Sequence, residues 1–206
     1  IAIHVSSSFA RPYPTSAAPK FQYDFRTLWG DNWDDEFGIS QLGLPRGMVN
    51  RIGYINDAHQ MGKDQWATNV ASELKKNIDF SINLAATDTN LSCDVNIINN
   101  INNNYYMVVC LTENQIVNWQ KDLQLEIEEY IHNHVLRKSI TGLLGDQIPS
   151  DKVGHDKVFE KEFQYVIPSE FKKENVKMVA FVTESSKKET INVRVSKIGE
   201  SQDLEK

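Results

Sequence analysis

Apolar side chains recur at every second position through most of the chain after residue 78, and this alternation constrains the fold more than any other feature. In "FSINLAAT", Phe80, Ile82 and Leu84 share one face, because successive side chains of a strand point to opposite faces. The same period occurs in "CDVNII", "VFEKEFQYVI", "VKMVAFVTE" and "TINVRVSKI", whereas "YYMVVCLT" is apolar on both faces, as a central strand requires. About seven short strands predict an immunoglobulin-like antiparallel β-sandwich over residues 78–198.

The first 77 residues mix strand and helix signals instead. The opening "IAIHV" and the residues from Met48 each predict a short strand. Within "TSAAPKFQYDFRTLWG", Phe21, Phe25 and Leu28 stand at helical spacing, and Gly30 follows as a residue typical of helix C-caps. This segment therefore predicts a helix that ends near residue 30.

The stretch "DQWATNVASELKK" predicts a second helix. Trp66, Val70 and Leu74 recur every four residues and form an apolar stripe, and Asp64 can serve as the N-cap. The sequence thus predicts an α+β fold: a mixed α/β region over residues 1–77, the sandwich over 78–198, and a polar, disordered tail over 199–206.

The charge balance disfavours binding to nucleic acid. The chain has 22 Lys and Arg against 28 Asp and Glu, for a net charge of −6, whereas a phosphate backbone is bound by basic residues. No apolar run reaches the roughly 18 residues of a membrane span. Because the chain starts with Ile1 and its first residues read as the middle of a strand, we expect an excised or processed piece, with any signal peptide or lipid anchor upstream.

The two cysteines, Cys93 and Cys110, flank "NIINNINNNYYM", which predicts a hairpin tip. If the flanking strands pair around Ile101 and Asn102, the cysteines oppose each other, and a disulfide could form in an oxidising compartment. Two buried free thiols are the favoured alternative.

The stretch "YIHNHVLRKSITGLLG" raises the question of a metal site. On a strand, His132 and His134 would project from one face, a spacing that zinc ligands use. A third ligand would have to come from His155 or from the acids between Glu126 and Glu129, which nothing in the spacing places. The favoured interpretation puts both histidines on a solvated or half-buried sheet face.

Two further predictions concern the neighbourhood of this stretch. Arg137 is expected to pair with Glu128 or Glu129 at the rim of the sheet. The segment 123–130, "LQLEIEEY", fits a helix and a strand equally well, so its structure stays open.

Other candidate sites are weak. "GDNWDDEFG" lacks the ligand spacing of a calcium loop and predicts an acidic surface turn. The aromatic residues Tyr13, Tyr23, Trp29 and Trp33 are expected in the core rather than on a ligand platform. Without a nucleophile elbow, a zinc-protease motif or a phosphate loop, the sequence assigns no catalytic, cofactor-binding or metal residue.

"GLPRG" resembles the proline loop of thioredoxin-like folds. There a proline with a cis peptide bond precedes a strand beside the redox-active cysteines, and here Leu44-Pro45 precedes the strand predicted from Met48. The chain contains no C-x-x-C, and disulfide exchange needs a thiolate.

Three stretches resemble the 28-kilodalton outer membrane protein family of Gram-negative envelope lipoproteins: "GLPRGMVNR", "EEYIHNHVLRKSITGLLG" and "FQYVIPSEFKKENVKMVAFV". The resemblance implies that residues 1–77 are a partial thioredoxin-like α/β domain followed by the immunoglobulin-like sandwich. It also implies a lipid-anchored precursor in the outer membrane or at the cell surface, with the periplasm as the alternative.

We therefore expect a non-enzymatic cell-envelope lipoprotein domain that serves in surface binding or adhesion. Its partner would be a protein or another ligand of the host or envelope surface, and no cofactor is expected. The alternatives are a fragment of a thioredoxin-like thiol-disulfide oxidoreductase that lacks its CxxC and a purely structural envelope module.

Overall fold

A computed structural model describes residues 1–6, 11–12, 20–87, 89–97, 103–155 and 157–205. Two α-helices lie in the first part of the chain, α1 (Leu28–Phe37) and α2 (Lys63–Glu73). The strands follow: β1 (Phe80–Ala86), β2 (Asn90–Ile97), β3 (Tyr105–Glu113), β4 (Ile116–Asp122), β5 (Leu125–His132), β6 (Val135–Ser139), β7 (Asp146–Ile148), β8 (Val158–Gln164), β9 (Val176–Glu184) and β10 (Thr190–Lys197).

Two antiparallel sheets enclose the main hydrophobic core. One sheet has the order β1-β2-β8, and the other has the order β10-β9-β3-β6 with β7 beside β3. Between them the side chains of Phe80, Ile82 and Leu84 from β1 meet those of Met107 and Met178, all with no exposed surface. The protein is therefore α+β with a sandwich-like arrangement, as the alternation predicts, and the immunoglobulin-like type stays a prediction.

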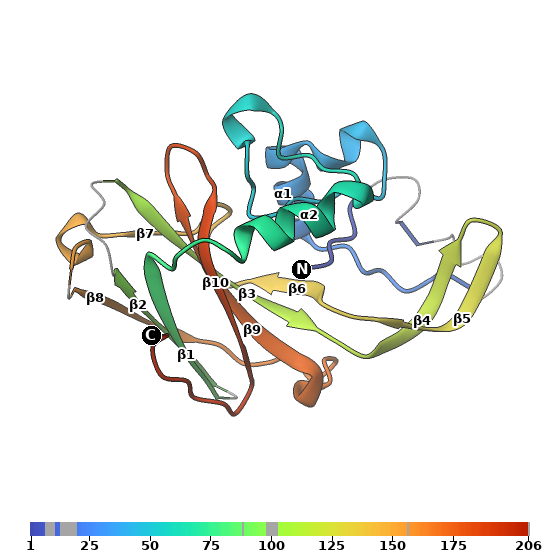
Figure 1. Cartoon of the computed structure of the whole chain (residues 1–206). Helices are drawn as coiled ribbons and strands as arrows, with labels where there is room; N and C mark the ends of the chain where they lie inside the picture. Colours follow the sequence, from blue (N-terminus) through green and yellow to red (C-terminus); the bar gives the residue numbers. More distant parts are fainter. Residues whose placement is uncertain (7–10, 13–19, 88, 98–102, 156, 206) are drawn as a thin grey trace.

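The second sheet is covered on its other face as well. Val108 and Phe181 point away from the sandwich core and pack with Trp33 and Phe37 of α1 in a second hydrophobic cluster. Figure 1 shows the helices over this face, on the side away from β1, β2 and β8. The first 77 residues thus form a third layer, which explains why β3 is apolar on both faces.

The first helix lies later than the sequence predicts. Thr27 caps its start by accepting a hydrogen bond from the Gly30 backbone at 3.0 Å, and Gly38 ends it in the left-handed conformation (φ 61°). A helix through Phe21 is wrong because Phe21 itself has φ 58°. The acidic stretch predicted as a surface turn is most of this helix.

The second helix is confirmed, but its apolar stripe is largely exposed. Gly62, not Asp64, occupies the N-cap. Trp66 donates from Nε1 to the Met61 carbonyl at 3.2 Å, whereas Leu74 is 81% exposed. Periodicity alone therefore did not tell how deeply the helix is buried.

The short strands expected at "IAIHV" and from Met48 do not form among the described residues. Single bridges occur instead, between Ala2 and Val135 and between Gly47 and Met61. The Leu44-Pro45 peptide bond is cis, as its resemblance to a thioredoxin-type loop predicts. The thioredoxin-like character of residues 1–77, and with it the boundary before residue 78, stays a prediction.

The pairing predicted for Cys93 and Cys110 is wrong. Strand β2 pairs with β1 and β8, whereas β3 lies in the other sheet, so the cysteines do not oppose each other. Both are free and buried, Cys93 in the sandwich core and Cys110 in the cluster under α1. The hairpin tip itself, residues 98–102, lies outside the described residues.

The tail predicted to be disordered lies along β1 up to residue 205. The Gln202 backbone donates to the Leu84 carbonyl at 2.9 Å, and the Ala86 backbone donates to the Glu200 carbonyl at 3.0 Å. Farther along, the Ser81 hydroxyl donates to the Glu205 carbonyl at 2.7 Å. The tail thus satisfies backbone groups at an edge of the β1-β2-β8 sheet that would otherwise face solvent.

Deleting residues 199–206 should lower the free energy of unfolding by about 1–3 kcal/mol, because several hydrogen bonds are lost while their partners gain access to water. Urea denaturation measures this change. The amide of Ala86 should also exchange faster with solvent, whereas that of Val109, bonded to the Thr141 hydroxyl in the sheet interior, should respond only to global unfolding. Unchanged exchange at Ala86 would contradict this role of the tail.

Candidate functional site

His132 and His134 do not share a strand face. His132 ends β5 and is buried, whereas His134 has φ 58° and lies in the turn before β6. The His134 backbone donates to the Asn114 side chain at 2.7 Å, which holds this turn. The left-handed residue breaks the period of two, so the geometry predicted for a histidine pair is wrong.

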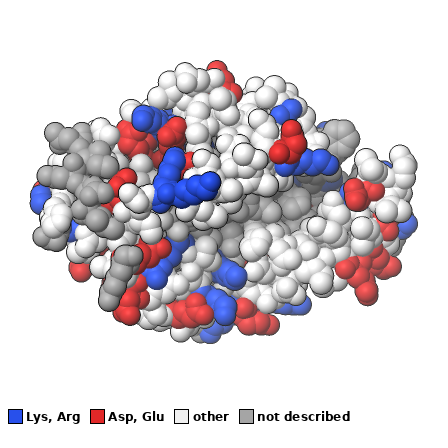
Figure 2. All heavy atoms as spheres, in the orientation of Figure 1, with Lys and Arg blue, Asp and Glu red and all other residues white. Residues whose placement is uncertain are grey.

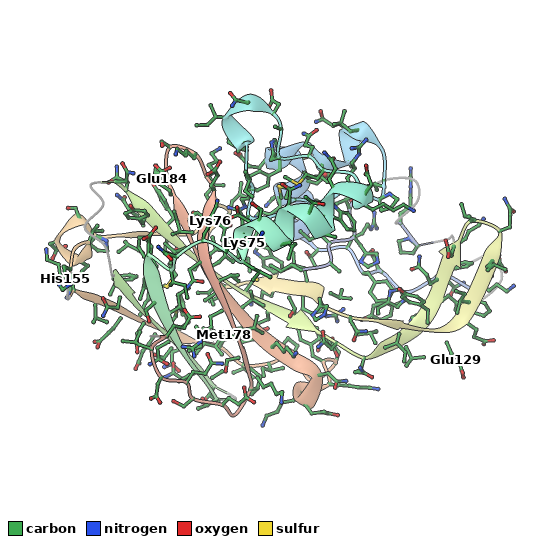
Figure 3. The ribbon with its side chains drawn as sticks, in the orientation of Figure 1. Lys75, Lys76, Glu129, His155, Met178 and Glu184 are labelled. Carbon is green, nitrogen blue, oxygen red and sulfur yellow. The ribbon has the colours of Figure 1, made fainter. Side chains whose placement is uncertain are left out.

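Among the residues that the structure describes, no third metal ligand joins His132 and His134. Figure 3 shows His155 and Glu129 at opposite ends of the molecule. Within the described ranges, no group of three or more His, Cys, Asp or Glu side chains could hold a metal ion. Sequence spacing could not show that His155 lies far from the two histidines, because β5 belongs to a hairpin that projects away from the main sheets.

The neighbour of His132 is instead a residue that the sequence analysis did not single out, His4. The centroids of the two imidazole rings are 6.0 Å apart, and both rings contact Phe25, at 4.8 Å for His4 and 4.5 Å for His132. Burial and, secondarily, the nearby His132 lower the pKa of His4 to about 4, against an opposing effect of Asp24. Burial also lowers the pKa of His132. Both rings are therefore neutral at pH 7.

Arg137 pairs with Glu113 of β3, not with Glu128 or Glu129. Its Nε lies 3.2 Å from the Glu113 carboxylate, and the exposed fractions of the two side chains are 9% and 5%. The other carboxylate oxygen of Glu113 accepts from the Lys172 backbone at 2.9 Å. The expected partners are exposed on the projecting hairpin, whereas Glu113 lies opposite β6, the strand that carries Arg137.

The core position predicted for the aromatic residues is confirmed for Trp33 and in part for Trp29, and it is wrong for Tyr23. Trp33 is buried and donates to the Leu143 carbonyl at 2.7 Å, and Trp29 packs beside it. Tyr23 is exposed and contacts Phe25 with its ring tilted by 56°, while Tyr13 lies outside the described residues.

The β4–β5 hairpin projects from the rest of the molecule (Figure 1). Its strands pair with each other and, in the described part of the chain, with no other strand. One face is contacted by the N-terminal segment, through the Lys20–Glu126 ion pair and the packing of Phe21 on Trp119. The hairpin also carries four exposed apolar side chains that we call the hairpin patch: Val117, Leu125, Ile127 and Ile131, exposed by 54%, 66%, 36% and 47%. Val117 is paired with Ile131, and a register shift between Asn118 and Gln120 separates this pair from Leu125 and Ile127.

A pocket of about 290 Å³ lies elsewhere, between the N-terminal layer and the β9–β10 edge of the sheet. Its lining includes Phe37 of α1, Met48 after the cis-proline loop, Phe181 of β9 and the buried Arg51. The pocket and the hairpin patch could each receive a ligand.

A family model described as outer membrane protein Omp28 matches residues 31–202. The chain belongs to the Omp28 family. Membership makes it a protein of the cell envelope. No helix in the described part of the molecule is long and apolar enough to span a bilayer.

The solved structures that resemble the chain include two from Porphyromonas gingivalis. HBP35 is 16% identical with a TM-score of 0.56, covering 83% of this chain and 57% of its own, which shows a shared fold. A domain of the outer membrane lipoprotein Omp28 is 22% identical with a TM-score of 0.40, covering 60% of this chain and 90% of its own. No curated protein matches the chain.

The burial of the two thiols determines their reactivity. Burial raises the pKa of Cys110 to about 12 and raises that of Cys93 further, so neither forms the thiolate that attacks disulfides. We expect no reaction with Ellman's reagent in the native Omp28-family chain within minutes, and reaction of both thiols in urea. Rapid labelling of the native chain would show that one of the strands opens.

The histidine pair predicts a loss of stability in acid. Because the pKa of His4 is about 4 when folded and 6.5 when unfolded, the unfolded chain binds more protons between these values. Stability should therefore fall as the pH drops from about 6.5 to about 4, by on the order of 2–3 kcal/mol. His4→Phe keeps the ring stacking and should flatten this part of the curve of unfolding free energy against pH. An equally steep loss in the variant would assign the acid sensitivity to other groups.

Proposed function

We propose that this Omp28-family chain is a non-enzymatic binding domain of the cell envelope, used for surface binding or adhesion, and that it binds a protein partner through the β4–β5 hairpin. The observation that carries the proposal is the hairpin patch on a strand pair with open edges. Monomeric proteins rarely leave contiguous apolar side chains in water, and such patches mark sites of interaction.

The strand edges favour an extended partner. An unpaired edge offers backbone donors and acceptors to another strand, and proteins use such additions for peptide recognition. In the described part of the chain, neither outer edge of the projecting hairpin is paired with another strand.

The charges favour a basic partner. Four acids, Asp122, Glu126, Glu128 and Glu129, stand on the hairpin against one cation, Lys121. Figure 2 shows acidic side chains at this end of the molecule. A strand that alternates apolar residues with Lys or Arg would complement both the patch and the charge.

The chain's own thiols do not support the redox alternative, since both are buried and have raised pKa values. A thioredoxin-like oxidoreductase whose C-x-x-C lies elsewhere in a longer protein stays an alternative, and so does a purely structural role. The leading proposal includes a lipid anchor outside this chain. The anchor would hold the domain at the outer membrane while the hairpin projects from it.

The hairpin is tested by removing its apolar side chains. Leu125→Ser combined with Ile131→Ser should weaken saturable binding to immobilised fibronectin, laminin, collagen or envelope fractions by about tenfold or more. Its melting temperature should stay near that of the native chain, because exposed substitutions change stability little.

The matched control is Val166→Ser, which removes another apolar side chain, 72% exposed, in the loop after β8. It should bind like the native chain. Absence of native binding to every surface tested, or equal binding by the hairpin variant, would overturn the proposal.

A further inference from the structure

The pocket beside α1 contains a charged group that forms no ion pair with a carboxylate of the described residues. Arg51 is buried, with 6% exposure, and lines the pocket. Its guanidinium lies over the rings of Phe37 and Phe181, at 4.5 Å and 5.1 Å from their centroids. The Nη1 atom is buried and has no hydrogen-bond partner. Ring contacts stabilise a cation but do not satisfy its N–H donors.

The nearby carboxylates are engaged elsewhere. Glu36 accepts hydrogen bonds from Lys188 and from the Tyr54 hydroxyl, and Asp34 accepts from the Ser40 backbone at 2.8 Å. Across the described residues, no carboxylate forms an ion pair with Arg51. Burial lowers the pKa of Arg51 to about 10, partly offset by Cys110 and Glu36, so the side chain is still charged at neutral pH.

A buried charge without a partner is unfavourable, and buried charges in proteins are normally paired. The rest of the lining is mostly apolar, with Trp33 and Met48 beside the two rings that flank Arg51. Arg46 and Asp34 also line the pocket and offset each other in charge. The site therefore offers one net positive charge inside an apolar enclosure.

We propose that this pocket binds a small organic carboxylate with an apolar tail. The carboxylate accepts hydrogen bonds from the Arg51 guanidinium, whose planar fork suits a carboxylate, and the tail packs against the aromatic and aliphatic walls. A volume of about 290 Å³ is near the lower end of small-molecule pockets, which fits a tail of several carbons rather than a long lipid chain. This site is independent of the hairpin patch.

Calorimetric titration with octanoate and with octan-1-ol tests whether the charge of Arg51 contributes to ligand binding. The native chain should bind octanoate about tenfold or more tightly than octan-1-ol, which presents the same tail without the carboxylate. Arg51→Met should remove this preference. Lys152→Met, which removes an exposed cation at the 3₁₀ turn Ser150–Lys152, should keep it.

The stability of the ligand-free variant distinguishes a binding role from a structural one. If the charge of Arg51 is compensated only by a bound anion, Arg51→Met removes an uncompensated buried charge from the ligand-free protein. Its melting temperature should then rise. A fall would show that the arginine holds the layer together and would overturn the proposal. Equal affinity of the native chain for octanoate and octan-1-ol, or octanoate affinity unchanged by Arg51→Met, would overturn it as well.

Discussion

The burial of β3 and β9 on both faces is the constraint on which the rest of the structure depends. Met107 and Met178 enter the sandwich core, while Val108 and Phe181 point the opposite way and need a second cover. A sandwich of two sheets would leave that second face in water, at a cost of about 25 cal/mol for each Å² of apolar surface. The N-terminal layer removes this cost. The N-terminal layer is therefore needed for the stability of this sheet and is not an independent domain attached to it.

Local patterns predicted the strands because each pattern reports one physical condition. Alternation in β1 follows from its single buried face, and the apolar run in β3 follows from its two. Pairing between strands depends on distant parts of the chain, and there the sequence misled. Cys93 and Cys110 flank a short Asn-rich segment that suits a hairpin, yet β2 crosses to the other sheet, since β3 takes β6, β7 and β9 as neighbours.

The candidate sites were harder to predict, for the same reason. His132 and His134 drew attention as close neighbours in sequence, but one left-handed residue separates their environments. The residues that do meet, His4 and His132, are far apart along the chain, and nothing in "IAIHV" marks the first of them. Arg51 gave no signal either. It ends the strand predicted from Met48, and only the packing of α1 and β9 around it encloses its charge.

Two arginines with little exposed surface, Arg137 and Arg51, differ in how their charge is compensated. Arg137 is held by Glu113, so its charge is compensated within the chain, and it joins the edge strand β6 to the central strand β3. Arg51 lies between aromatic rings and lacks such a partner among the described residues. If residue 51 served only stability, an apolar side chain would suit the position better. Hydrophobic packing can often replace even a paired buried ion without loss of stability. The pocket beside Arg51 offers an explanation for the arginine at this position, because a bound ligand could supply the carboxylate that pairs with it.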